Sequence, residues 1–244
     1  MGCFNAARLP GYIDHTLLKP DATAREIEKL CAEARDHGFF AVCVNGAWVQ
    51  AASRLLEGTS VKVVSVAGFP LGAVPAEAKC FETSLAVDKG AQEIDFVLNI
   101  GRLKEGDRRY LLDEIRAVVK AAGGRLVKAI IECCLLNRDE KILACLLAEE
   151  GGAHFVKTST GFGKGGATSA DVQLMRQTVG TKTGVKAAGG IRDARTALAL
   201  IEAGATRLGT SAGVAILEGL NHFNNSIPGE KHEVLRSNPE DERP

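Results

Sequence analysis

The sequence predicts an α/β protein with the fold of a closed (β/α)8 barrel, or TIM barrel, built as a single domain. Short apolar runs alternate with segments of helical periodicity along the chain, which is typical of a parallel sheet. Eight such runs are present, and eight strands favour closure into a barrel over an open doubly wound sheet. The 244 residues also fit the size of a one-domain barrel.

The expected strands are short apolar or β-branched runs, each followed by a polar or glycine-containing loop. A helical segment follows each of them, so the strands should lie parallel to one another. The expected strands are residues 13–16, 41–45, 61–67, 94–99, 126–133, 155–160, 185–188 and 207–210.

Helix signals lie between these strands. Thr23 and Glu26 have the spacing of a capping box, Pro75 suits a first helical position, and Thr168 with Asp171 gives another cap-like start. Three further segments combine mixed charge with an apolar spacing of about 3.6 residues, as surface helices do. These segments are residues 107–122, 137–150 and 193–203.

The composition changes near the end of the chain. Beyond Gly219 asparagine, proline and charged residues dominate, with few apolar anchors. We therefore expect the barrel domain to span residues 1–219 and residues 220–244 to form a polar C-terminal tail.

Charge and cysteine content narrow the class of function. Thirty basic and thirty acidic residues give zero formal net charge, so no global field attracts nucleic acid or an anionic membrane. There is no apolar stretch of about 18 residues and no signal segment. The seven cysteines are scattered without C-x-x-C spacing, and Cys133 and Cys134 are expected in the core. This pattern predicts a reduced, cytoplasmic protein whose partner is a small molecule.

Strand alternation turns several ionisable residues toward the barrel interior. Asp95, Lys128, Lys157 and Lys186 alternate with apolar neighbours on four successive expected strands, and Glu132 should share a face with Lys128. Any one of them alone is readily explained as half of a buried ion pair or as a lysine at a strand end. Four converging on one interior indicate a chemical site.

A lysine in such surroundings suits nucleophilic catalysis. Burial and neighbouring positive charge disfavour an ammonium ion, and a neutral amine attacks an aldehyde or ketone to give an iminium ion. The iminium ion acidifies the adjacent C–H, which a carboxylate, a second lysine and water can deprotonate. Alternation alone does not choose between Lys157 and Lys186 as the nucleophile.

Glycines gather after the last three expected strands. Loops after the seventh and eighth strands of barrels often bind phosphate through backbone N–H groups and a helix N-terminus. The sequence therefore predicts a phosphate site there. Its candidate residues are Gly189, Gly190, Gly209, Thr210 and Ser211.

Several motifs, in order over residues 12–216, resemble those of the deoxyribose-phosphate aldolase family. These class I aldolases reversibly join acetaldehyde and D-glyceraldehyde 3-phosphate to form 2-deoxy-D-ribose 5-phosphate. The matching segments are residues 14–20 (DHTLLKP), 42–45 (VCVN), 66–72 (VAGFPLG), 93–95 (EID), 155–163 (FVKTSTGFG) and 185–192 (VKAAGGIR).

The resemblance implies a role for each matched residue. Lys157 would form the Schiff base. Lys186 would perturb this nucleophilic lysine and would take part in proton transfer together with Asp95. The resemblance implies neither a metal nor another cofactor. It implies assembly as a homo-oligomer, either a dimer or a tetramer, and a place in deoxyribonucleotide catabolism. The implied substrate-binding residues are Asp14, Thr16, Cys43, Lys128, Thr160, Gly189, Gly190, Gly209 and Ser211.

Two positions depart from the family pattern. Some members end in a tyrosine that reaches the site, whereas the tyrosines of this chain are Tyr12 and Tyr110. Ala212 stands where some relatives have a second serine.

Other hypotheses for the function are a phosphate-binding isomerase, a lysine aldolase for another sugar and a non-catalytic phosphosugar sensor. The five dispersed histidines disfavour a metal aldolase, and His154 should face outward.

Overall fold

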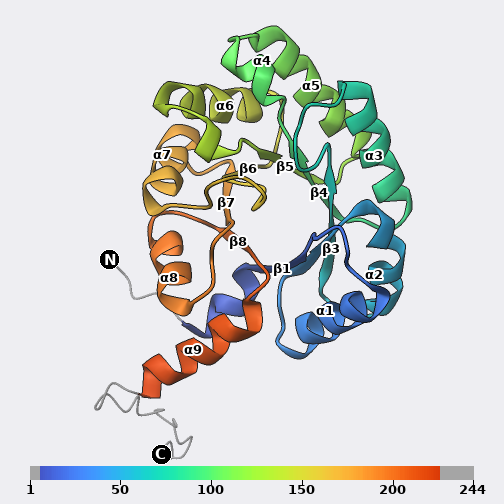
Figure 1. The fold of residues 1–244 in the computed structure, drawn as a ribbon, viewed down its shortest axis with the longest axis vertical. Coiled ribbons are helices and arrows are strands. Elements are labelled where there is room, and N and C mark those ends of the chain that lie inside the picture. Colours follow the sequence, from blue (N-terminus) through green and yellow to red (C-terminus); the bar gives the residue numbers. More distant parts are fainter. Residues whose placement is uncertain (1–5, 226–244) are drawn as a thin grey trace, which may run out of the picture.

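The computed structural model describes residues 6–225, and it has a closed barrel of eight parallel strands in chain order. Figure 1 shows the strands at the centre with the helices arranged around them. The barrel predicted from the sequence is therefore confirmed. The strands are β1 (Ile13–Leu17), β2 (Ala41–Val44), β3 (Lys62–Ala67), β4 (Glu93–Val97), β5 (Leu126–Ile130), β6 (Phe155–Lys157), β7 (Gly184–Ala188) and β8 (Arg207–Thr210).

Helices connect successive strands and cover the outer face of the barrel (Figure 1). Within residues 6–225, none of them has both the length and the apolar character needed to cross a bilayer. The α-helices are α1 (Ala24–Asp36), α2 (Val49–Leu55), α3 (Ala76–Asp88), α4 (Ile100–Lys104), α5 (Arg108–Ala121), α6 (Arg138–Glu150), α7 (Ser169–Val179), α8 (Ala194–Glu202) and α9 (Gly213–Asn225). The 3-10 helices are η1 (Ala6–Tyr12), η2 (Gly46–Trp48) and η3 (Cys133–Leu135).

The helix starts follow the capping signals closely. The side chain of Thr23 accepts from the backbone N–H of Glu26 in a complete capping box, and Thr168 caps α7 through the N–H of Asp171. Asn137 forms a further capping box at the start of α6. Pro75 is the N-cap of α3 and not its first helical residue, a shift of one position within normal boundary variation.

Two packing layers follow from strand alternation. Ile94 and Phe96 of β4 belong to the large apolar core between the sheet and the helices. Asp95, between them, faces the other way and lies in register with Lys128 of β5. The charged residues of the central strands therefore occupy the barrel interior, as predicted.

Some element ends differ from the sequence expectation. β5 ends at residue 130 and β6 at residue 157, both earlier than expected, because the chain turns there into loops. Helix α9 continues to Asn225, so the expected boundary at residue 219 falls inside this helix. The remainder of the expected tail, from residue 226 onward, lies outside the described residues.

Candidate active site

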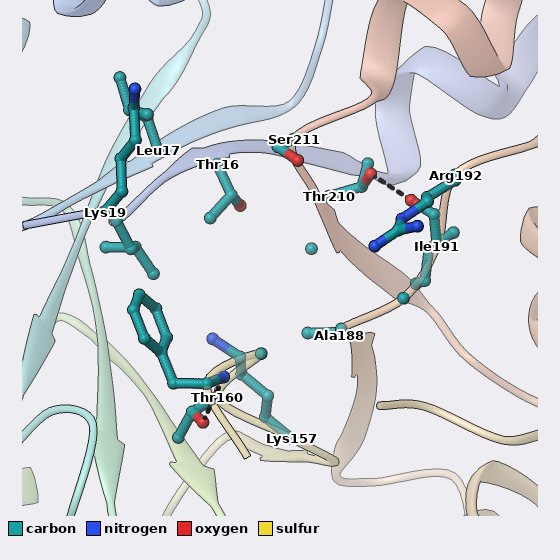
Figure 2. A pocket seen from close by; sticks show the side chains of 16 residues that line it. Thr16, Leu17, Lys19, Lys157, Thr160, Ala188, Ile191, Arg192, Thr210 and Ser211 are labelled. Atoms are coloured by element: carbon teal, nitrogen blue, oxygen red, sulfur yellow. Dashed lines mark hydrogen bonds between the residues drawn. The ribbon is translucent and has the colours of Figure 1, made fainter. Parts of the chain in front are cut away.

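A pocket of about 440 Å³ opens at the carboxyl ends of the strands. This is the end at which barrel enzymes carry their active sites. In Figure 2, the side chain of Lys157 reaches into the pocket, while Thr16, Ser211 and Arg192 line its other sides. The lining residues are Thr16, Leu17, Leu18, Lys19, Lys157, Thr160, Gly161, Phe162, Ala188, Gly189, Gly190, Ile191, Arg192, Gly209, Thr210 and Ser211.

Lys157 is the last residue of β6, in register with Ile130 of β5 and Lys186 of β7. Its side chain runs through the barrel interior, and only 2% of the residue is exposed. The Nζ atom lies 2.9 Å from Oδ2 of Asp95. Among Asp95, Lys128, Lys157 and Lys186, Lys157 is the one that lines the pocket.

Beneath the pocket, charged side chains form a closed ring of ion pairs, which we call the interior ring. Acidic and basic residues alternate around it, and each contacts its two neighbours. In order, the pairs are Asp14 with Lys186, Lys186 with Asp95 (2.8 Å), Asp95 with Lys128 (2.7 Å), Lys128 with Glu93 (2.6 Å), Glu93 with Arg207 (3.3 Å) and Arg207 with Asp14 (2.7 Å).

The interior ring is balanced in charge without Lys157. Its carboxylates are Asp14, Glu93 and Asp95, and its cations are Lys128, Lys186 and Arg207. Lys157 contacts only Oδ2 of Asp95, an oxygen that Lys186 also contacts. Among the described residues, Lys157 therefore shares its one carboxylate partner, Asp95, with Lys186.

The ion pairs of the ring favour the charged forms of Asp14, Asp95, Lys186 and Arg207. Burial alone would raise the pKa of Asp95, but Lys128, Lys157 and Lys186 outweigh it and hold that pKa well below the usual value. Burial alone would likewise lower the pKa of Lys186, yet Asp14 and Asp95 raise it. Lys186 is therefore a fixed positive charge beside Lys157.

The sequence-predicted residues divide into two groups. Thr16, Thr160, Gly189, Gly190, Gly209 and Ser211 line the pocket beside Lys157. The others lie deeper in the barrel and are fully buried. These buried residues are Asp14, Cys43, Asp95, Lys128 and Lys186.

Two of these predicted positions have defined local partners. Thr16 is in register with Cys43, and its hydroxyl donates to the backbone oxygen of Asp14 at 2.8 Å. Cys43 belongs to a small apolar cluster that includes Leu18 and Val66, inside the barrel. Burial raises the pKa of the Cys43 thiol, so it is neutral at physiological pH.

Sequence reasoning missed Glu93 and Arg207, which complete the interior ring. The same alternation rule would have found them, because Glu93 shares a face with Asp95 and Arg207 with Gly209. Arg207 also lies over the ring of Phe40, 3.5 Å from its centroid. That contact fixes the guanidinium plane below the site.

Two expectations need correction. Glu132 is not on a continued strand β5, because β5 ends at residue 130 and Glu132 has a left-handed backbone with φ 52°. Cys133 is buried as expected, but Cys134 is exposed. His154 is exposed as expected, and its Nδ1 accepts from the backbone N–H of Val127 at 3.1 Å.

The closed barrel, with a pocket at the carboxyl ends of its strands and a buried lysine beside it, has the architecture of a barrel enzyme. The family model of the DeoC/LacD family aldolases matches residues 10–224, and the chain belongs to this family. It is an aldolase.

Known relatives cover almost the whole barrel. The deoxyribose-phosphate aldolase of Alkaliphilus oremlandii is 63% identical over 207 residues, which are 84% of this chain and 93% of the relative. That of Streptococcus pneumoniae serotype 19F is 60% identical over 212 residues, 87% of this chain and 96% of the relative. The solved tetrameric deoxyribose phosphate aldolase of Aeropyrum pernix has a TM-score of 0.84 and 34% identity, covering 90% of this chain and 93% of that chain.

Proposed function

We propose that this aldolase reversibly cleaves 2-deoxy-D-ribose 5-phosphate to D-glyceraldehyde 3-phosphate and acetaldehyde through a Schiff base on Lys157. The observation that carries the proposal is the position of its Nζ atom. That atom lies at the pocket, 2.9 Å from Asp95, whose same oxygen is 2.8 Å from Nζ of Lys186. The names of the close relatives support the choice of substrate.

Schiff-base formation uses the free amine of a lysine. The charges of the interior ring cancel among themselves, so its carboxylates are paired without Lys157. The pocket gives the amine access to a carbonyl group, whereas Lys128 and Lys186 are fully buried and paired. These features favour Lys157 over Lys186 as the nucleophile.

The amine attacks C1 of the open-chain sugar, and loss of water leaves an iminium ion. A base removes the proton of the C3 hydroxyl, the C2–C3 bond breaks, and its electron pair passes to the iminium nitrogen to give an enamine. Glyceraldehyde 3-phosphate departs at this step. C2 then takes a proton from the relay of Lys186, Asp95 and water, and hydrolysis releases acetaldehyde and the free amine.

The opposite side of the pocket suits the phosphate group. Gly189, Gly190 and Ser211 line it, and Arg192 adds a positive charge there (Figure 2). The N-terminus of α8 is occupied by its own cap, Asp193. Helix α9 instead begins directly after the Ser211 loop, so its N-terminal dipole is available to an anion in the pocket.

Reductive trapping tests the proposal. Sodium borohydride with acetaldehyde should add a two-carbon group to the peptide that carries Lys157, as read by mass mapping. The Lys157→Ala variant should stay folded, show no adduct and release no acetaldehyde from 2-deoxyribose 5-phosphate. An adduct on Lys186 in the wild-type protein, or none, contradicts the assignment. Turnover of ketose phosphates would indicate an aldolase for another sugar.

Assembly as a homo-oligomer, dimer or tetramer, stays a prediction. The tetrameric relative from Aeropyrum pernix supports it, and so do large apolar side chains on the surface, such as Leu71 and Phe81. Sedimentation velocity at several protein concentrations checks it. The cytoplasmic location also stays a prediction, in keeping with free thiols at the six cysteines of the described residues.

A further inference from the structure

Glu132 follows β5, in contact with the pocket residue Thr160, and has an unusual backbone. Its φ is 52° and its ψ is 67°, and among the described residues it is the non-glycine residue with positive φ. This left-handed region is disfavoured for a side chain of this size. Such conformations persist where surrounding contacts impose them, and they concentrate at functional sites.

The Glu132 carboxylate is buried, with 4% of the residue exposed, and it is directed at the loop after β6. Oε2 accepts a short hydrogen bond from the Thr160 hydroxyl and a longer one, 3.3 Å, from the Thr160 backbone N–H. The Sγ of Cys134 lies 3.7 Å from Oε1. The carboxylate therefore joins the end of β5 to a residue that lines the pocket.

The loop packs directly over this carboxylate. A Cβ atom added at Gly163 would lie 3.3 Å from Cδ of Glu132 and 3.0 Å from Sγ of Cys134. Glycine at this position therefore lets the loop approach closely. The loop residues 160–163 therefore lie close to the side chain of Glu132.

The contact continues from Thr160 to the pocket wall. The Thr160 hydroxyl, which donates to Glu132, accepts from the backbone N–H of Phe162 at 3.1 Å (Figure 2). Phe162 lines the pocket with 49% of its surface exposed, and it meets the ring of Phe69 edge to face, with centroids 5.3 Å apart. Phe69 in turn packs on the apolar cluster that contains Leu18.

We infer that Glu132 is a positioning residue of the active site. Its carboxylate fixes the Thr160 hydroxyl, and this hydroxyl fixes Phe162 as the apolar wall of the pocket beside Lys157. Thr160, expected to bind substrate, then acts through the loop, because its hydroxyl proton is already committed to Glu132. The effect on substrate binding rests on the proposed function, because it assumes 2-deoxy-D-ribose 5-phosphate as the substrate. The geometry of the loop is tested without any substrate.

The variants separate the carboxylate from the backbone. Asparagine and glycine tolerate a left-handed backbone better than glutamate does, so Glu132→Asn and Glu132→Gly remove the charge without adding backbone strain. A second pair approaches the same contact from the other side. Thr160→Ser keeps the hydroxyl, whereas Thr160→Val removes it and keeps the shape.

The first measurement is amide hydrogen exchange of the substrate-free protein. Glu132→Asn and Thr160→Val should speed exchange in the peptide covering residues 158–166 and leave the strands β1 to β4 unchanged. Thr160→Ser should exchange like the wild type. Wild-type exchange in Glu132→Asn and Thr160→Val overturns the inference, whether or not the protein cleaves 2-deoxyribose 5-phosphate.

The second measurement is steady-state kinetics with 2-deoxyribose 5-phosphate. Loss of a charge-assisted hydrogen bond to the loop should raise KM about tenfold in Glu132→Asn and Thr160→Val. The kcat value should change much less, since Lys157 and the interior ring are untouched, and Thr160→Ser should restore KM. An unchanged KM together with faster exchange overturns the role in the site. If Glu132→Asn does not fold, the Thr160 pair decides the outcome.

Discussion

Gly209 leaves the space that the side chain of Lys186 occupies. A Cβ atom at Gly209 would lie 3.1 Å from Cε of Lys186 and 3.1 Å from Cβ of Ala188. Lys186 is fully buried, and its Nζ is held by Asp14 and Asp95, so the side chain has no room to retreat. Gly209 thus makes room for Lys186 and also lines the pocket.

Gly209→Ala should therefore disturb catalysis without abolishing the fold. The added methyl group displaces Lys186 from Asp95, so kcat should fall at least tenfold. Overpacking of this kind destabilises by about 1–3 kcal/mol. Steady-state kinetics and urea denaturation measure the two effects.

Gly219→Ala provides the matched control for this substitution. Gly219 lies in helix α9, and a Cβ there would meet its nearest neighbour, Cβ of Ala194, at 3.9 Å, an ordinary contact. Alanine in a helix interior is favoured by about 1 kcal/mol, so this variant should keep its activity and gain stability. Equal kinetics in both variants would contradict the role given to Gly209.

Arg207→Lys should show that charge alone does not maintain the interior ring. Nη1 of Arg207 contacts Asp14 at 2.7 Å, and the Nη1 and Nη2 atoms each lie 3.3 Å from Glu93. A lysine ammonium lacks this planar fork, so we expect a loss of about 1–3 kcal/mol in the free energy of unfolding and a lower kcat. The exposed Arg109→Lys is the control, expected within about 0.5 kcal/mol of wild type.

The stability should depend on pH on both sides of neutrality. The lowered pKa values of Asp14 and Asp95 stabilise the fold above the unfolded carboxyl pKa of about 3.9, and this stabilisation is lost as the pH falls through the lower folded values. The raised pKa of Lys186 stabilises the fold below about pH 10.4, and this contribution is lost as the pH rises through the folded value.

Denaturation curves measured across the pH range test this dependence. Asp95→Asn should flatten the acid side, and Lys186→Met should flatten the alkaline side, because each removes one titrating group from the folded state. Slopes identical to those of the wild type in both variants would exclude the interior ring as their source.

The two residues of a second buried ion pair, outside the barrel, should be energetically coupled, although the pair should add little net stability. Lys79 of α3 lies 2.6 Å from Glu114 of α5, and both side chains are fully buried. Burial lowers the pKa of Lys79 and raises that of Glu114, so the attraction between them does not offset the desolvation of either group.

Breaking this pair one side at a time should be costly. Lys79→Met or Glu114→Gln alone should lower the free energy of unfolding by about 3–5 kcal/mol, since one charge stays buried without a partner. The double variant should lose less than the sum of the two, with a coupling of about 0.5–3 kcal/mol in the double-mutant cycle. Additive losses would contradict the coupling.

Alternation of apolar and polar residues predicted the eight strands, the barrel and the inward direction of Asp95 and the three lysines. These features depend on periods of two and 3.6 residues, which are local properties of the chain. The position of Lys157 at the pocket, and of Lys128 and Lys186 beneath it, depends on how far each strand extends along the barrel. That register is set by contacts between strands and is not readable from one strand alone.

Two parts of the site were not predicted from the sequence, for different reasons. Arg207 and Glu93 obey alternation, but their pairing joins residues far apart in the chain. Glu132 breaks alternation, since its left-handed backbone follows from the loop that packs on it. Sequence periodicity carries no signal for such a conformation in a residue other than glycine.

The contact between Arg207 and Asp14 links the last strand to the first. During synthesis, Lys157 and Asp95 emerge before β8 exists, so the ion pairs beneath them are incomplete while the chain is unfinished. Until β8 is in place, Asp14 and Glu93 lack the guanidinium group that they share. The barrel interior therefore reaches its balance of charge only when the last strand joins the first, which couples closure of the barrel to the burial of its ion pairs.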